Sequence, residues 1–269
     1  MTEDSLISEA ASDAWVDVLL PTRAPAPWLG ETLDGLLVQT HHNWRLVAVV
    51  HGDPSELTRL ILDRVPNAVI VPMTQDAKLQ DLLNAGLKSC TADYVARQDH
   101  DDVPEPTRLA EQVAFLQEHP KVLAVGSAAT EIDEHGNEIG LREIPSGPGV
   151  LKGLRWRSML IHPSVMFRRA AVLEVGGYDV GASNAEDYEL WLRLAAVGEL
   201  DNVSEPLLRY RVHAQQMSQA RAIPRATRAL VGKSRRALAH SRRESVIMAQ
   251  LRQIAWSAPQ IVRSIRRPT

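Results

Sequence analysis

The chain has 269 residues, of which 45% are hydrophobic, and its formal net charge is −3 at pH 7. This is enough apolar material for one large domain, or for a domain with an appendage, and it excludes a chain that is disordered throughout. The single cysteine, Cys90, excludes intramolecular disulfides and a cysteine-based zinc site, so we expect a small core residue in a reducing, cytoplasmic setting. Residues 1–14 are acidic and polar, which argues against a signal peptide, and no segment reaches transmembrane length.

Basic residues are concentrated near the end of the chain. Residues 221–269 contain twelve Lys or Arg and one acid, Glu244, a balance of +11 that leaves −14 for the rest. Pro224, with no strand-like run beyond it, predicts that a helical extension begins near this point. The sequence therefore predicts a polar N-terminal segment over 1–14, a main domain over 15–220 and a basic helical extension over 221–269.

Strand-like runs alternate with helical patterns in the first half of the chain. The expected strands cover 16–20, 45–50, 68–71 and 94–98, and the expected helices cover 28–39, 56–64, 78–89 and 107–119. This alternation predicts βαβ units, and so an α/β fold with a central, mostly parallel sheet. An apolar stripe on the first helix favours packing in the core. Its members are Trp28, Leu29, Leu33, Leu36 and Leu37.

The alternation ends by the middle of the chain. After an expected strand over 122–127, the residues 129–132 and 138–142 predict a hairpin around the turn 133–137. The segment 143–159 is rich in Pro and Gly, which suits a mobile loop over a ligand and equally an ordinary surface connection.

A run of acids, Asp99-His100-Asp101-Asp102, follows the expected strand over 94–98. Ligands collect at the carboxyl ends of strands in open α/β sheets, and several carboxylates there can hold a divalent cation, which usually binds a phosphate. In the alternative interpretation, the run is an acidic loop, and Asp102 or Thr107 caps the helix that starts near Pro106.

Two further groups of chemically capable residues lie in the second half. A turn over 176–179 leads to a helix over 186–194, whose apolar positions are Leu190, Trp191, Leu194 and Val197. Glu186 and Asp187 lie in its first turn, where one carboxylate can act as a general base, or where both simply interact favourably with the helix dipole. His213 follows a strand-like run over 207–210 and is either a metal ligand or a structural histidine.

Together these segments resemble the inverting family 2 glycosyltransferases, whose nucleotide-sugar-binding domain is a single α/β unit of the GT-A type. Matches in order over about 200 residues are far more specific than any single motif. They cover 16–23, 33–44, 84–87, 99–102, 108–120, 162–168, 176–179, 186–194 and 210–213. The run over 99–102 is similar to the DxD signature of that family.

The resemblance implies a role for each matched residue. Asp99 and Asp101 would hold Mg²⁺ or Mn²⁺, and Asp99, His100 and Asp101 would contact the ribose or diphosphate of a nucleotide sugar. Asp187 would be the general base that takes a proton from the acceptor hydroxyl, and Glu186 would adjust its position or pKa. His213 matches a position that completes the metal or diphosphate site. The nucleotide base and ribose would lie against Pro21, Thr22 and Arg23.

One stretch departs from the family pattern. After the second strand, relatives typically carry two aspartates followed by Gly-Ser, and one of those acids recognises the nucleotide base. Here the stretch is Val49-Val50-His51-Gly52-Asp53-Pro54. Either Asp53 substitutes from a shifted position, with His51 as a further hydrogen-bonding group, or the contact is missing, so the donor nucleotide stays open among UDP, GDP, dTDP and CDP.

The resemblance implies a metal-dependent transfer of a sugar from a nucleotide sugar to a hydroxyl of a glycan or lipid-linked acceptor, in polysaccharide, glycolipid or related synthesis. Two alternatives are an impaired GT-A domain that serves as a binding or scaffold module, and a nucleotidyltransferase. Apolar and basic residues of the extension, from Val246 to Arg267, suit peripheral contact with the inner face of the cell membrane, or packing on the main domain or on a second subunit. Nucleic acid is not an expected partner, because no nucleic-acid module is recognised.

Overall fold

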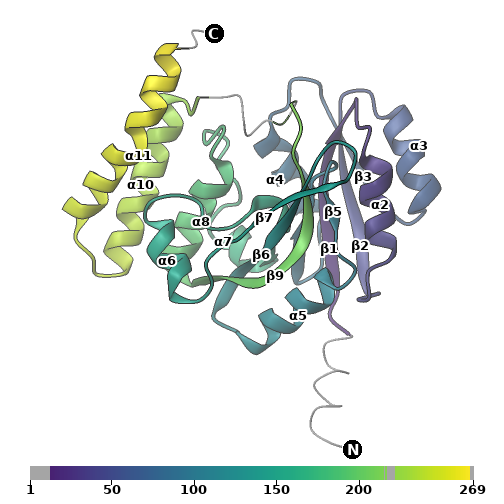
Figure 1. The fold of residues 1–269 in the computed structure, drawn as a ribbon, viewed down its shortest axis with the longest axis horizontal. Helices are drawn as coiled ribbons and strands as arrows, with labels where there is room; N and C mark the ends of the chain where they lie inside the picture. Colours follow the sequence, from purple (N-terminus) through teal and green to yellow (C-terminus); the bar gives the residue numbers. More distant parts are fainter. Residues whose placement is uncertain (1–12, 215, 217–221, 267–269) are drawn as a thin grey trace, which may run out of the picture.

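A central twisted sheet carries helices on both faces, and a pair of long helices lies at one side (Figure 1). The structure is a computed structural model, and it describes residues 13–214, 216 and 222–266. Within these residues the sheet has nine strands in the order β3-β2-β1-β4-β8-β6-β9-β5, with β7 paired to β6. The strands are β1 (Val16–Arg23), β2 (Trp44–His51), β3 (Val69–Met73), β4 (Tyr94–Arg97), β5 (Val103–Pro104), β6 (Val122–Ile132), β7 (Glu138–Arg142), β8 (Met166–Arg168) and β9 (Glu199–Arg211).

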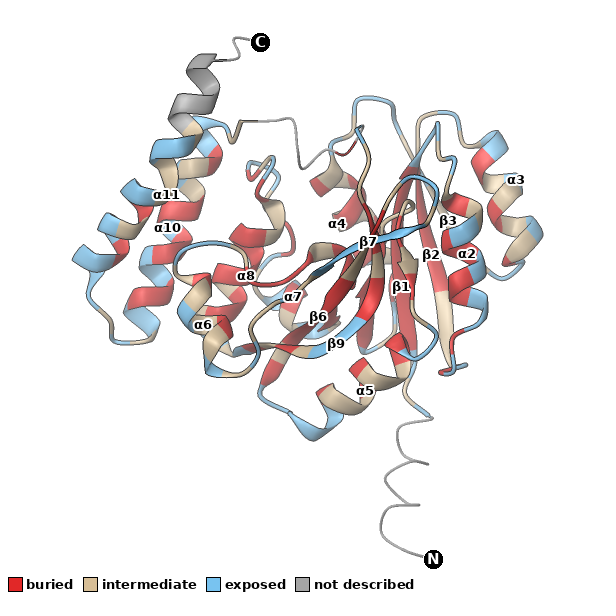
Figure 2. Cartoon of the chain, in the orientation of Figure 1, coloured by how far each residue is buried: buried red, intermediate tan, exposed pale blue. Residues whose placement is uncertain are grey.

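The strands β3, β2, β1 and β4 pair in parallel, as the alternating pattern predicts. Their connecting helices are α2 (Leu29–Leu37), α3 (Ser55–Arg64) and α4 (Leu79–Ser89). Successive side chains on a strand point to opposite faces of the sheet. Val18 and Leu20 therefore join the core beneath α2 and α3, whereas Leu19 joins the core beneath α4. Burial is nearly continuous along β1, β2 and β4, whereas β3 at the edge of the sheet is only partly buried (Figure 2).

The second half of the sheet is mixed. The strand β8 pairs antiparallel with β4 and β6, β7 forms the predicted hairpin with β6, and β9 runs parallel to β6. Parallel ladders still hold most of the paired residues, so the expectation of a mostly parallel sheet is confirmed. The helices of this half are α5 (Arg108–Glu118), α6 (Pro148–Leu154), the 3₁₀ turn η1 (His162–Ser164), α7 (Arg169–Glu174) and α8 (Glu186–Val197).

Several sequence expectations were wrong in detail. Trp28 is half-buried rather than a core residue, and Leu37 and Val197 are 50% and 66% exposed, because each lies at the end of its helix and off its buried stripe. The segment 143–159 contains the helix α6, which holds the fully buried Val150 and Leu154 against the core. This segment is therefore anchored in the domain instead of being a loop throughout. Cys90 is fully buried and unpaired, as expected.

The helix pair at the side consists of α10 (Arg225–Ser241) and α11 (Val246–Arg266). The helix α10 packs on α8, and α11 packs on α10. Across the described helices, none is long and apolar enough to span a membrane. The expected polar segment over 1–14 lies mostly outside the described residues, and so do the boundary at residue 220 and the basic residue Arg267.

Parallel pairing brings the ends of β1, β2 and β4 to one edge of the sheet. The acid run over 99–102 follows β4, and His51 ends β2. The strand β9 ends at Arg211, beside the hairpin of β6 and β7, and delivers His213 to the same region. The topology therefore gathers the candidate site residues from segments that are distant in sequence.

Candidate functional site

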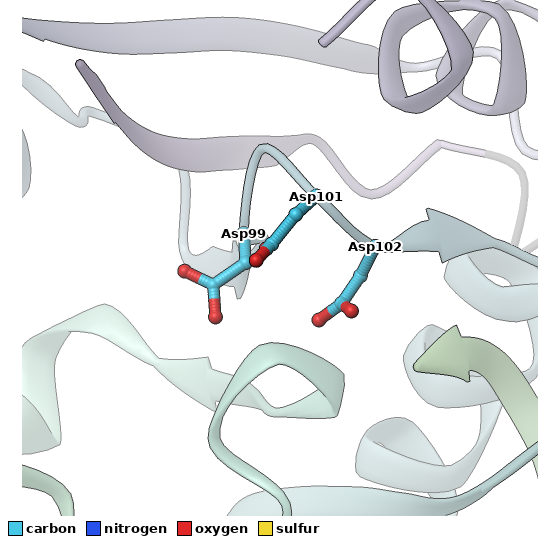
Figure 3. A group of neighbouring side chains, drawn as sticks. All are labelled: Asp99, Asp101 and Asp102. Atoms are coloured by element: carbon cyan, nitrogen blue, oxygen red, sulfur yellow. The ribbon is translucent and has the colours of Figure 1, made fainter. Parts of the chain in front are cut away.

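Three carboxylates extend from the loop between β4 and β5 to one side (Figure 3). We call residues 99–102 the acid loop. One oxygen each of Asp99, Asp101 and Asp102 lies within 4.8 Å of the others. Asp102 is missing from the ligand set that the sequence predicted, whereas His213, which was in that set, is not a member of this group.

Asp102 is the most constrained of the three acids. Its side chain is buried, Oδ1 accepts a hydrogen bond of 2.8 Å from the backbone N–H of Arg211, and Oδ2 is buried with no hydrogen-bond partner among the described residues. Burial, and then the charges of Asp101 and Asp99, raise the pKa of Asp102 well above its usual value. Thr107 occupies the N-cap position of α5, as the alternative interpretation expected, but it makes no side-chain cap bond, and Asp102 bonds to Arg211 instead of capping the helix.

His213 is placed by a contact with the acid loop. Its Nε2 lies 2.9 Å from Oδ2 of Asp101, and its ring lies 4.6 Å from the ring of Trp28, between ring centroids. On the other side of the loop, Asp99 forms an ion pair with the buried guanidinium of Arg97, the last residue of β4. Asp99 and Asp101 are therefore each already oriented by one basic side chain.

Arg211 is a residue of the site that the sequence analysis did not single out. Its side chain is fully buried; Nε donates to the carbonyl of Asp101 (2.9 Å), and Nη2 donates to Oε2 of Glu31 (2.6 Å). Its Nη1 donates to the carbonyl of Asp133 at the tip of the hairpin (3.1 Å). Arg211 thus ties the acid loop to α2 and to the hairpin. No local sequence signal singles it out, because these partners lie 78 to 180 positions away in sequence.

The second acidic group, Glu186 and Asp187, lies in the first turn of α8, as predicted. Both side chains are half-buried. Burial, and then the charge of Asp187, raise the pKa of Glu186 to about 7, and burial also raises the pKa of Asp187. Oγ of Ser158, which follows α6, lies 3.4 Å from Oδ2 of Asp187. A carboxylate with a pKa near neutrality suits general base chemistry.

A buried polar pair lies on the turn before α8. His162 Nε2 is 3.0 Å from the hydroxyl of Tyr178, and burial lowers the pKa of His162 well below its usual value. Asn84 fixes this turn, because its side chain bonds both the N–H and the carbonyl of Tyr178. Gly177 is required here, since its φ is +70° and a Cβ would meet Oδ1 of Asn84 at 2.6 Å.

The residues predicted to hold the nucleotide base are less closely assembled. Pro21, Thr22 and Arg23 end β1, and Oγ1 of Thr22 is buried with no hydrogen-bond partner in the described part of the chain. His51 Nε2 contacts the carbonyl of Gln75 (3.0 Å). Asp53 is exposed, and its Oδ1 accepts bonds from the N–H and hydroxyl of Ser55 at the start of α3. His100 lies half-buried between Asp99 and Asp101.

The acid loop fits a divalent cation. All three donors are carboxylate oxygens, which Mg²⁺ and Mn²⁺ prefer. The buried Oδ2 of Asp102 has an unused acceptor position, and three neighbouring carboxylates repel one another unless a cation or protons offset their charge. Asp99, Asp101 and Asp102 are thus able to hold such an ion, with His213 orienting Asp101.

Comparisons with known proteins agree with this arrangement. The model of the family "Glycosyl transferase family 2" matches residues 17–176. The chain is 34% identical over 198 residues to the amylovoran biosynthesis glycosyltransferase AmsE of Erwinia amylovora, covering 72% of this chain and 74% of that one. It is 29% identical to the O-antigen biosynthesis glycosyltransferase WbnJ of Escherichia coli, covering 74% of this chain and 80% of that one.

Solved structures share the fold. The 1–349 portion of S. aureus TarS in complex with UDP-GlcNAc superposes with a TM-score of 0.67 at 13% identity, over 90% of this chain and 71% of that one. This chain covers 42% of the longer TarS chain. The mannosyltransferase PcManGT of Pyrobaculum calidifontis, in complex with GDP-Man and Mn²⁺, superposes with a TM-score of 0.55 at 18% identity, over 98% of this chain and 83% of that one. The chain therefore belongs to glycosyl transferase family 2, with a GT-A fold, and is a glycosyltransferase of glycan synthesis.

Proposed function

We propose that this protein transfers a sugar, with inversion and with the help of a divalent cation, from a nucleoside diphosphate sugar to a hydroxyl group of its acceptor. The observation that carries the proposal is the acid loop, where one carboxylate oxygen each of Asp99, Asp101 and Asp102 lies within 4.8 Å of the others, and where Oδ2 of Asp102 is buried with no partner among the described residues. A bound Mn²⁺ or Mg²⁺ would stabilise negative charge on the departing nucleoside diphosphate.

The chain's own residues supply the rest of the chemistry. The acceptor hydroxyl attacks the anomeric carbon as the bond from that carbon to the diphosphate oxygen breaks, and Asp187 takes the hydroxyl proton. Glu186 lies beside Asp187, and burial followed by the charge of Asp187 raises the pKa of Glu186. Such a base typically contributes about 10² to 10⁴ in rate. Attack by the acceptor itself needs no covalent enzyme intermediate.

The donor nucleotide would lie between the ends of β1 and β2 and the acid loop. TarS was solved with UDP-GlcNAc and PcManGT with GDP-Man, which supports a nucleotide sugar as donor class and leaves the base open. Asp53 bonds to Ser55 and not toward the sheet edge, so the base contact made by an acid in relatives is altered here. We therefore infer a donor whose base is held mainly by the end of β1, with Thr22 as a hydrogen-bonding group.

The acceptor would be a growing glycan or a lipid-linked sugar in the cytoplasm. Among relatives, an Escherichia coli galactosyltransferase that is 28% identical is named for a GlcNAc-diphosphoundecaprenol acceptor, and it supports the lipid-linked alternative. Such an acceptor would lie at the inner face of the membrane.

The altered β2 end gives a specific reason to keep a second candidate, an impaired GT-A domain that binds a nucleotide without turnover. Both candidates are tested by thermal stabilisation with a panel of nucleoside diphosphates and nucleotide sugars, each with Mn²⁺, Mg²⁺ or EDTA. We expect a metal-dependent shift with one nucleotide, and we expect Asp101→Ala to lose that shift.

Turnover separates the two candidates. An active enzyme releases nucleoside diphosphate, and Asp187→Asn should retain the metal-dependent binding while turnover disappears. Binding without turnover on any acceptor in the native protein would favour the impaired module. Release of pyrophosphate from a nucleoside triphosphate and a sugar phosphate would instead identify a nucleotidyltransferase.

A further inference from the structure

The helix α11 exposes an apolar stripe. Ile247, Leu251 and Ile254 are 74%, 52% and 58% exposed, and they are spaced by four and three residues, which puts them on one face of the helix. We call these three residues the outer stripe. Val246 and Met248, beside it, are also exposed. Figure 2 shows the exposed residues along the outer side of this helix.

The opposite face of α11 is the one that packs on the domain. Ala249 and Gln253 are buried, and Gln253 Nε2 donates to the carbonyl of Arg228 on α10 (2.7 Å). Trp256 packs against Tyr188 of α8, with ring centroids 5.6 Å apart. These residues fix the rotation of α11, so the outer stripe points away from the rest of the molecule.

Arginines flank the outer stripe. Arg225, Arg228 and Arg236 of α10 line a groove between α10 and α11, whose other wall includes Gln250 and Ser257. Arg225 and Arg236 are exposed, and Arg228 is half-buried. We call these three side chains the arginine rim. The α10 wall of the groove therefore carries guanidinium groups and the α11 wall carries neutral polar groups, and the exposed apolar stripe lies on α11 next to this groove.

The positive charge of this region is not neutralised locally. Glu244, the single acid of residues 221–269, is paired with Arg155 and Arg252. The balance of +11 in this part of the sequence faces −14 in the remainder, so the whole molecule is polarised toward the helix pair. An exposed apolar face with a basic rim is the pattern of a helix that lies in the interface of an anionic bilayer.

We propose that the outer stripe and the arginine rim dock this protein on an anionic lipid bilayer. The apolar side chains would enter the boundary between headgroups and acyl chains, and the arginines would bind lipid phosphates. A second copy of this chain is a weaker occupant, because two such surfaces would bring like charges together and three side chains cover little of the area that a stable dimer needs.

Docking would place the membrane at the side of the molecule that α10 and α11 form (Figure 1). Any consequence of docking for a lipid-linked acceptor rests on the proposed function, whereas the docking itself does not.

The test is flotation of the full chain with vesicles of phosphatidylcholine, with and without phosphatidylglycerol, at low and high salt. We expect binding only to the anionic vesicles and weaker binding at high salt. The triple variant Ile247→Gln, Leu251→Gln, Ile254→Gln should lower the partition coefficient by about tenfold or more. All three side chains are exposed in the native protein, so the fold should persist.

The matched control replaces three equally exposed apolar residues away from α11, namely Ile139, Leu141 and Val180, by Gln. It should bind the vesicles as the native protein does. If this control loses binding to the same extent as the outer stripe variant, the proposal is overturned, because general surface hydrophobicity would then explain the partition.

The charge component is tested in the same way. Arg225→Gln, Arg228→Gln, Arg236→Gln should lower binding to anionic vesicles by about tenfold and flatten the salt dependence. The control Arg59→Gln, Lys88→Gln, Lys121→Gln removes the same number of charges elsewhere and should have a much smaller effect.

The proposal would also be overturned if the native protein did not bind vesicles, or if the outer stripe variant bound them as well as the native protein does. It would equally be overturned if light scattering showed a native dimer that is monomeric in the outer stripe variant, while neither protein bound vesicles. Nucleotide-induced stabilisation is measured on the same samples. If vesicle binding fails while nucleotide binding is intact, the docking proposal fails and the proposed function does not. If nucleotide binding fails while vesicle binding is intact, the proposed function fails and the docking proposal does not.

Discussion

Two loops that follow parallel strands on either side of β1 differ in how they are held. The acid loop follows β4, and residues 51–54, which we call the β2 loop, follow β2. Distant segments fix the acid loop, because Asp102 is bonded to Arg211 and Asp101 to His213. In the β2 loop, Asp53 bonds to its neighbour Ser55, whereas His51 and Gly52 are tied to the end of β3 and the residues after it, through the carbonyls of Gln75 and Met73.

The difference between the two loops shows where function constrains the sequence of this fold and where the sequence can change. The acid loop contains the buried Asp102, whose Oδ2 has no hydrogen-bond partner among the described residues, and a cation is a natural partner for it. An exposed side chain with local bonds, such as Asp53, can change without disturbing the sheet. This difference explains how the β2 loop departs from the family pattern while the acid loop resembles it.

The largest effect is expected for Asp101→Asn. It should lower kcat/KM by roughly 10² to 10³, because a group that stabilises charge in the transition state is typically of this importance. The measurement is turnover at saturating Mn²⁺, and Asp63→Asn, which changes an exposed acid on α3, is the control. A loss of less than tenfold in kcat/KM would mean that the acid loop is no more important for turnover than the β2 loop.

Arg211→Gln should act through the acid loop without touching the donor. We expect the metal concentration for half-maximal activity to rise by about 10- to 100-fold, the usual range for a residue that orients ligands. The rate at saturating metal should fall less. Arg209→Gln is the control, because Arg209 also donates to the hairpin, at the carbonyl of Gly136, but has no bond to the acid loop. Equal effects of the two variants would contradict a positioning role for Arg211.

The pH dependence of kcat/KM tests whether the start of α8, where Glu186 lies, is a functional part of the site like the acid loop. The pKa of Glu186 is raised to about 7 from an ordinary 4.5, so kcat/KM should rise as the pH passes through about 7 and Glu186 ionises beside Asp187. Glu186→Gln removes this group, and the acid limb of the profile should move to lower pH. An unchanged limb would assign it to another residue.

The same shift has a consequence for stability. Between pH 4.5 and about 7 the folded protein binds more protons than the unfolded chain at this position, so the free energy of unfolding falls as the pH rises. In Glu186→Gln this part of the pH dependence should be absent. Urea unfolding of both proteins across that range measures the difference.

The sequence predicted those parts of the fold that depend on local periodicity. The alternation over 16–119 gave the parallel strands and their helices, and the hairpin over 129–142 was also expected. The short elements β8 and α6 were not predicted, because a three-residue strand and a Pro- and Gly-rich helix are set by the surfaces on which they pack. Trp28 was expected in the core, and its place beside His213 depends on a contact between α2 and the end of β9.

The site residues divide in the same way, into those with a local sequence signal and those that distant contacts place. Asp101, Asp187 and His213 were candidates because each follows or begins a recognisable element, although their roles remain proposals. Asp102 and Arg211 were missed as site residues because their positions depend on bonds that span 109 and 180 positions in sequence. A single sequence carries no local signal for contacts of that range.

The smallest effect is expected in the β2 loop. In Asp53→Ala the carboxylate that bonds Ser55 is lost, and the start of α3 should fray, while the dissociation constants for nucleoside diphosphates should change by less than about threefold, since an exposed, locally bonded acid contributes little. The measurement is calorimetric titration with UDP and with GDP in the presence of Mn²⁺. His51→Ala is the companion variant, because His51 is held by Gln75 at the same edge. A selective loss of affinity for one nucleotide in Asp53→Ala would show that Asp53 leaves Ser55 to recognise the base. The β2 loop would then belong with the acid loop as a functional element, and the contrast between the two loops would describe only the unliganded protein.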